Sequence, residues 1–222
     1  MSKLKKQLIA AAVLLAGFAA AFGSYLLFSP EERRSSGLDV KPAAEALPVR
    51  ESSHRLSEPK KSELTIVEFL DFECEGCGAY YPVVEQLREE YGDRVTFVAR
   101  YFPMPGHRNG ELAARTAEAA ARQGKFEEMY NKLFTTQKEW GEAQESKESV
   151  FRGFAKDLGL DMTRFDADLA DPNVAARIQA DQRDGLALGV QGTPSFLFDG
   201  ERITNPSSYK AFKALIDAKL SD

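Results

Sequence analysis

The pattern of apolar and polar residues divides the chain into three parts. An uncharged apolar run extends from Leu8 to Phe28, and a segment rich in Ser, Glu, Arg, Pro and Lys follows it. From Glu63 onward, apolar residues recur with the periods of strands and helices. We therefore predict an N-terminal hydrophobic segment at 1–28, a linker at 29–61 with room for a short strand at its end, and one folded domain at 62–222.

The predicted domain begins with a strand, a helix and a second strand. A stretch rich in β-branched and aromatic residues predicts a buried strand at 63–71. Helical spacing of apolar residues as far as Tyr91 predicts a helix that begins at Cys74 or Glu75, and the second strand covers 94–102. This order predicts parallel pairing through a right-handed crossover.

The chain from about 108 to 188 is predicted to be an all-helical insertion. Its helices are expected at 111–122, 125–134, 150–158, 162–170 and 173–188. A turn at Asp199-Gly200 then predicts a hairpin with strands at 195–198 and 201–204, and a helix at 207–220 closes the domain. The predicted fold class is α/β, with helices inserted between a β-α-β half and a β-hairpin-α half.

The N-terminal segment is long enough to be a membrane anchor. It has the roughly 20 apolar residues that a membrane-spanning helix needs, and lysines precede it at positions 3, 5 and 6. The positive-inside tendency then predicts a cytoplasmic N-terminus and an extracytoplasmic domain. A cleaved signal peptide is the alternative, because Ala19 and Ala21 offer a cleavage site. The run continues to Phe28, which favours the anchor.

Composition narrows the function. Charged residues make up 28% of the chain with both signs interspersed, and the net charge is -5, so nothing indicates nucleic-acid binding. The chain has 2 cysteines and 2 histidines, which supply neither a disulfide framework nor a four-ligand zinc site. His54 lies in the polar linker and is expected to be solvated, without a role. His107 is the one plausible outside ligand if the cysteines bound a metal.

The two cysteines form a Cys-x-x-Cys pair where the first strand meets the first helix. A thiolate at a helix N-terminus is stabilised by free amide groups and by the helix dipole, so we expect Cys74 to have a lowered pKa and to be the attacking sulfur. Cys77, one turn further along, is expected to be the buried resolving thiol. A structural disulfide and a metal site are the alternatives to this redox pair.

Acidic residues surround the pair. Along the strand, Glu68 shares a face with Leu70, Phe72 and Cys74, so its carboxyl group is expected under the pair, buried among apolar residues. A buried glutamic acid has a raised pKa and can accept a proton from the resolving thiol. Glu73 and Glu75 are expected to be exposed, and their charges oppose ionisation of Cys74.

A third feature is Gly192-Thr193-Pro194, just before the hairpin. By itself this is an ordinary turn proline, and only about 5–6% of such bonds are cis in folded proteins.

Together these features resemble the DsbA family of thioredoxin-fold proteins, close to membrane-anchored members. The resemblance covers about residues 62 to 220. It rests on Glu68 six positions before the first cysteine, on Phe72-Glu73-Cys74-Glu75-Gly76-Cys77, on the helical insertion, and on Gly192-Thr193-Pro194-Ser195-Phe196. It implies a thioredoxin fold in which Cys74 attacks substrates, Cys77 resolves, and Glu68 is the buried acid. It also implies that Thr193-Pro194 is a substrate-binding cis-proline loop that faces the disulfide.

One departure concerns redox tuning. Strongly oxidising members of the family carry Pro-His between the cysteines, whereas this chain has Glu75-Gly76, with no imidazole to stabilise the thiolate. Because about 30 mV corresponds to about 1.4 kcal/mol, a small change in thiolate stabilisation alters the direction of the reaction.

The resulting hypothesis is an extracytoplasmic thiol-disulfide oxidoreductase that introduces disulfide bonds into reduced, unfolded exported proteins. It needs no cofactor beyond the Cys74-Cys77 disulfide and no metal. The resemblance implies a membrane reoxidase of the DsbB or vitamin K epoxide reductase type as partner, and a monomer is expected. The alternatives are a reductase or isomerase of the same fold, and a metal-binding or interaction module with a structural disulfide.

Overall fold

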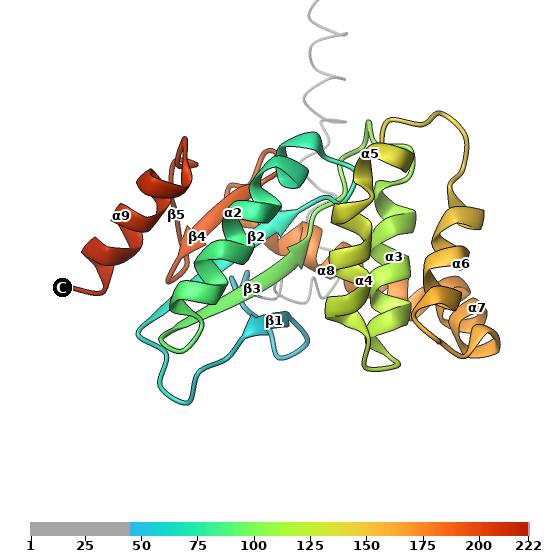
Figure 1. The fold of residues 1–222 in the computed structure, drawn as a ribbon, viewed down its shortest axis with the longest axis horizontal. Coiled ribbons are helices and arrows are strands. Elements are labelled where there is room, and N and C mark those ends of the chain that lie inside the picture. Colours follow the sequence, from blue (N-terminus) through green and yellow to red (C-terminus); the bar gives the residue numbers. More distant parts are fainter. Residues whose placement is uncertain (1–44, 222) are drawn as a thin grey trace, which may run out of the picture. The chain divides into compact units, whose positions relative to one another are not determined.

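The structure is a computed structural model that describes residues 45–221 (Figure 1). The chain divides into two units, Met1–Glu45 and Ala46–Asp222, and the second is the folded domain considered below. The predicted membrane segment at 1–28 and residues 29–44 of the predicted linker lie outside the described residues. Within residues 45–221, no helix has both the length and the apolar character needed to cross a bilayer.

A mixed sheet of five strands forms the centre of the domain, in the order β1-β3-β2-β4-β5. The strands are β1 (His54–Ser57), β2 (Leu64–Leu70), β3 (Val95–Tyr101), β4 (Ser195–Phe198) and β5 (Glu201–Arg202). The central strand β2 runs parallel to β3 and antiparallel to β4, so Glu68 lies between Ala99 and Phe196. The parallel pair and the hairpin confirm the predicted α/β fold, a thioredoxin fold.

Helix α2 (Glu75–Tyr91) connects the two parallel strands, and a helical insertion separates β3 from β4. The insertion consists of α3 (Gly110–Ala121), α4 (Phe126–Thr135), α5 (Gln137–Trp140), α6 (Glu148–Asp157), α7 (Met162–Ala170) and α8 (Pro172–Ala187). The closing helix is α9 (Tyr209–Lys219). The four-residue α5 was not predicted, because it is too short to show a helical period.

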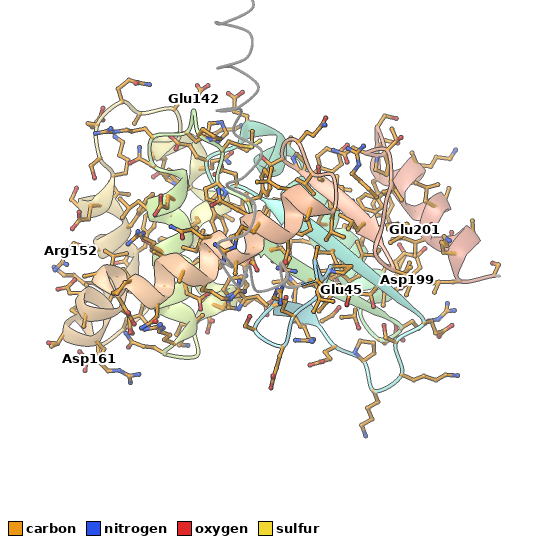
Figure 2. The ribbon with its side chains drawn as sticks, turned by 180° about the vertical axis from the view of Figure 1, so that it is seen from behind. Glu45, Glu142, Arg152, Asp161, Asp199 and Glu201 are labelled. Atoms are coloured by element: carbon orange, nitrogen blue, oxygen red, sulfur yellow. The ribbon has the colours of Figure 1, made fainter. Side chains whose placement is uncertain are left out.

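Helices cover both faces of the sheet (Figure 1). On one face, α2 and α9 enclose a core in which the rings of Phe196 and Phe212 lie 4.9 Å apart. Seen from behind in Figure 2, α8 crosses the other face. There, a Cβ atom at Gly185 would lie 2.8 Å from the ring of Phe102 and 3.0 Å from that of Phe69, so glycine allows α8 to pack closely on the sheet.

The folded unit begins at Ala46 and so includes the last residues of the predicted linker, where β1 is the short strand for which the prediction left room. Strand β1 pairs with the edge of β3 and buries Leu56. The expectation that His54 is solvated is wrong, because its side chain is 14% exposed. Its Nε2 lies 2.7 Å from Glu118 Oε2, and its ring stacks on Phe126 with centroids 3.7 Å apart. Leu56 is the single large apolar residue of this strand, so the hydropathy pattern indicated the strand only weakly.

Candidate active site

Cys74 occupies the N-cap position of α2, where β2 has ended and the chain turns into the helix. Its backbone is extended (φ -68°, ψ 120°), and helical geometry begins at Glu75. The Cys74 side chain is partly exposed, whereas Cys77 is fully buried, and both are free thiols in this structure. The predicted placement at the strand-to-helix junction is therefore confirmed.

The two thiols differ strongly in acidity. Hydrogen bonds from the side chains of Cys77 and Thr193, and from the backbone amides of Cys77 and Gly76, lower the pKa of Cys74 to about 5. Partial burial of Cys74 opposes this shift. Burial raises the pKa of Cys77 well above its usual value, and the hydrogen bond to Cys74 and the charge of Glu68 act in the same direction. At neutral pH the pair therefore consists of an accessible thiolate and a buried thiol.

The loop before β4 lies directly against the cysteine pair. The Thr193-Pro194 peptide bond is cis, as the resemblance implied. In the dithiol form Cys74 Sγ donates to the carbonyl oxygen of Thr193 at 3.2 Å, and Asn205 Nδ2 donates to the carbonyl oxygen of Pro194 at 2.7 Å. A Cβ atom at Gly76 would lie 3.1 Å from Pro194 Cδ and 3.4 Å from Cys74 Sγ. Glycine at position 76 thus permits the close approach of this loop.

Glu68 lies in the apolar layer beneath the pair, as predicted. It is 5% exposed, and it faces the core that also contains Cys77. Burial, with smaller contributions from the charges of Glu85 and Cys74, raises the pKa of Glu68 to about 8. A cavity of about 10 Å³ is lined by Glu68 and by apolar side chains of the sheet and helices, and its volume is about that of one water molecule.

The two glutamates next to Cys74 have different environments. Glu75 is exposed, as predicted, but the prediction for Glu73 is wrong, because its side chain is 2% exposed. The backbone amide of Asn109, at the N-cap of α3, donates to Glu73 Oε2 at 2.5 Å. A helix N-terminus compensates a buried carboxylate in this way, and the sequence around Glu73 carries no signal of that distant contact.

Gln137 of α5 is a supporting residue that the sequence did not indicate. Its side-chain amide donates to the carbonyl oxygens of Phe72 at 2.7 Å and Cys74 at 2.8 Å. A Cβ atom at Gly78 would lie 2.0 Å from Gln137 Oε1, so the absence of a side chain at position 78 makes room for this contact. The helical insertion therefore holds the turn that carries the first cysteine.

An open cleft of about 290 Å³ lies beside Cys74. Its walls include Glu75, Gly76, His107 and Arg108. His107 Nδ1 lies 2.5 Å from Asp71 Oδ2. Within residues 45–221, no group of three or more His, Cys, Asp or Glu side chains is arranged to hold a metal ion.

Comparison with known proteins identifies the family. A family model described as thioredoxin matches residues 58–218. A thioredoxin-like oxidoreductase from Silicibacter pomeroyi DSS-3 is 26% identical, with a TM-score of 0.67 over 81% of this chain and 99% of that one. Wolbachia pipientis alpha-DsbA1 is 19% identical, with a TM-score of 0.69 over 78% of this chain and 93% of that one. A periplasmic thioredoxin-like protein from Salmonella enterica serovar Typhimurium is 24% identical, with a TM-score of 0.61 and coverage of 77% and 91%.

Curated relatives match over a part of their length. The Na(+)/H(+) antiporter NhaA of Herminiimonas arsenicoxydans is 35% identical over 171 residues, which are 77% of this chain and 26% of the antiporter. The chain thus spans about a quarter of the length of the curated relatives it matches.

The family match includes the Cys-x-x-Cys pair, the buried glutamate and the cis-proline loop in one continuous range. The fold is shared with DsbA proteins, and the two thiols have the unequal acidities that thiol-disulfide exchange uses. The chain therefore belongs to the thioredoxin family.

Proposed function

We propose that this protein introduces disulfide bonds into exported proteins through the Cys74-Cys77 pair. The observation that carries the proposal is the contrast between a partly exposed, acidic Cys74 and a buried, weakly acidic Cys77 directly opposite Thr193-Pro194. The accessible sulfur suits attack by a large substrate, and the buried one is protected from it.

The reaction begins with the pair as a disulfide. A substrate thiolate attacks Cys74 Sγ, the bond to Cys77 breaks, and Cys77 leaves as a thiolate that takes up a proton. A second substrate thiolate then attacks the substrate sulfur of the mixed disulfide and releases the Cys74 thiolate. The substrate loses two electrons to the pair, which ends as one thiolate and one thiol.

Glu68 suits the proton transfer at Cys77. Its pKa of about 8 keeps the carboxyl group largely protonated at neutral pH, so it can supply a proton when Cys77 leaves and accept one when Cys77 attacks.

Thr193 and Pro194 are proposed to bind the substrate main chain. In the dithiol form the Thr193 carbonyl oxygen accepts a hydrogen bond from Cys74 Sγ. Neither a disulfide-bonded Cys74 nor a Cys74 thiolate has a proton to donate, so in the oxidised protein at neutral pH this carbonyl is available to a backbone amide of an extended substrate. The loop therefore offers a binding group in the state that reacts with substrate.

The low pKa of Cys74 supports the oxidising direction. Stabilising the thiolate favours the reduced pair, which makes the disulfide a better electron acceptor. Because Cys74 is partly exposed, solvent screening limits the gain to about 1–2 kcal/mol at pH 7, or ~20–40 mV. The exposed charge of Glu75 acts in the opposite direction and favours the alternative of a reductase or isomerase.

The proposed location is outside the cytoplasm, with the domain attached to the membrane by residues 1–28 or released by cleavage of that segment. The periplasmic Salmonella protein and the DsbA fold support an extracytoplasmic domain. In this setting the reduced pair is reoxidised by a membrane partner of the DsbB or vitamin K epoxide reductase type, and the protein acts as a monomer.

Oxidation of a reduced, unfolded test protein by the purified, oxidised enzyme tests the proposal. The wild type is expected to transfer one disulfide per molecule, and Cys74→Ser none. If the two proteins perform alike, the proposal is wrong. A Cys77→Ser variant is expected to accumulate mixed disulfides through Cys74, which non-reducing gels of cells would display and which would identify clients and the reoxidase.

A further inference from the structure

The loop after β3 brings a histidine into the cleft beside Cys74. His107 lies 30 positions after Cys77 in the chain, yet it lines the same cleft as Cys74 and Gly76. Its side chain is 33% exposed. Glu75 and Gly76, the two residues between the cysteines, carry neither an imidazole nor a positive charge. His107 brings an imidazole to the same cleft from outside the motif.

Asp71 fixes the orientation of this imidazole. The carboxylate is 1% exposed, directly after β2, and Oδ1 accepts the backbone amide of Glu73 at 2.9 Å. Oδ2 accepts the backbone amide of Met104 at 2.7 Å and lies 2.5 Å from His107 Nδ1. A Cβ atom at Gly110 would lie 2.6 Å from Oδ1, so the carboxylate is tightly enclosed. A carboxylate held at both oxygens binds the Nδ1 hydrogen and leaves Nε2 available for a second proton.

The charges around His107 favour its protonated form. Partial burial opposes the charge, but the hydrogen bond and charge of Asp71, together with the charges of Cys74 and Glu73, outweigh burial and raise the pKa of His107. The other charged groups that line the cleft are Glu75, Arg108 and Glu142. The imidazolium is thus paired with Asp71 on one side and is electrostatically coupled to Cys74.

We propose that His107, oriented by Asp71, adds a positive charge that stabilises the Cys74 thiolate alongside the hydrogen bonds to its sulfur. Asp71 is a positioning residue that acts through the histidine. Reduction of the disulfide delivers two electrons to the pair. Cys77 takes up a proton and Cys74 remains a thiolate beside the imidazolium. A stabilised reduced form raises the oxidising power of the disulfide, so the inference deepens the proposed function and rests on it for the direction of electron flow.

The test is a titration of the Cys74 thiolate in the reduced full-length protein. The ultraviolet absorbance of the thiolate reports its fraction at each pH. In His107→Gln the pKa of Cys74 is expected to rise by about one unit, as for the loss of one nearby charge. The equilibrium constant for oxidation of glutathione is expected to fall about tenfold, or ~30 mV. The loop position of His107 is compatible with an unchanged fold, which thermal unfolding verifies.

His54→Gln is the matched control, because His54 is the other of the 2 histidines and also contacts a carboxylate, that of Glu118. It is expected to leave the pKa of Cys74 unchanged. Asp71→Asn is expected to raise that pKa in the same direction as His107→Gln, because the histidine loses its anchor.

An unchanged pKa of Cys74 in a folded His107→Gln protein overturns the inference. So does a shift that appears in Arg108→Gln but not in His107→Gln, because the stabilising cation would then be the guanidinium group. The titration needs no protein substrate, so a failure of the proposed function in the protein-oxidation assay is distinguishable from a failure of this inference.

Discussion

The side-chain amide of Gln137 donates a hydrogen bond to the backbone carbonyl of Cys74, 2.8 Å away. This contact joins α5 of the helical insertion to the turn that presents the reactive thiol. The same amide group binds the carbonyl of Phe72, so one side chain satisfies two backbone acceptors on either side of Glu73. The insertion is therefore part of the support of the site.

Replacing Gln137 tests this support. Gln137→Ala leaves the carbonyls of Phe72 and Cys74 without their donor, and we expect the free energy of unfolding to fall by about 1–3 kcal/mol. Urea unfolding of the oxidised protein measures the loss. Gln86→Ala, an exposed position on α2, serves as control and should change the free energy by less than about 0.5 kcal/mol. Equal effects of the two substitutions would contradict the structural role of Gln137.

The buried carboxyl group of Glu68 predicts a pH dependence of stability. Its pKa is 4.5 for the ordinary group and about 8 in the folded protein, so between these values the folded state holds a proton that the unfolded state has lost. Stability therefore falls as pH rises through this window. Glu68→Gln should strongly reduce that dependence and raise the free energy of unfolding by about 2–4 kcal/mol at pH 7.5.

The measurement is denaturant unfolding from pH 5 to pH 8 in the oxidised protein, where neither thiol titrates. Glu89→Gln, an exposed substitution on α2, is the control and should retain the slope of the wild type. A Glu68→Gln protein with that same slope would show that the carboxyl group is not the source of the dependence.

The close packing of Gly76 predicts that a side chain there disturbs the cis-proline loop. In Gly76→Val the new Cβ would lie 3.1 Å from Pro194 Cδ, and its methyl groups would crowd Cys74 Sγ. We expect the oxidised protein to react with reduced glutathione at least about tenfold more slowly, which corresponds to an increase of roughly 1.4 kcal/mol in the activation free energy. Gly153→Ala in α6, where no atom lies within 4 Å of an added Cβ, should leave the rate unchanged. A rate in Gly76→Val equal to that of the wild type would refute this prediction.

Glu75 is expected to tune the thiolate weakly. Its exposed carboxylate is the residue directly after Cys74, and removing the charge in Glu75→Gln should lower the pKa of Cys74 by about 0.2–0.5 unit at low salt. The shift should diminish in 1 M salt, because the charge is solvent-screened. Titration of the thiolate at both salt concentrations measures it. A rise of the pKa would contradict the assignment of Glu75 as an opposing charge.

Much of the fold was predictable because its central elements have strong periodic patterns. The apolar β-branched run of β2 and the helical spacing of α2 locate the junction at Cys74 correctly. Counting by twos along β2 also places Glu68 on the face of the cysteine pair, since side chains alternate along a strand. These predictions rest on local sequence alone.

The remaining features depend on contacts between distant segments. The burial of Glu73 depends on the backbone amide of Asn109, and the role of Gln137 depends on the space left at Gly78. The pairing of His107 with Asp71 requires the end of β2 and the loop after β3 to meet, which parallel pairing of adjacent strands brings about. No period or motif in the sequence reports such contacts.

The reduction potential of the Cys74-Cys77 pair tests the central claim most directly. It is measured by equilibrating the protein with glutathione buffers and quantifying the reduced fraction. Because the thiolate of Cys74 is stabilised in the reduced form, we expect a potential at least ~20–40 mV more oxidising than the value of about -270 mV for thioredoxin. A potential at or below that of thioredoxin would contradict the account and indicate a reductase.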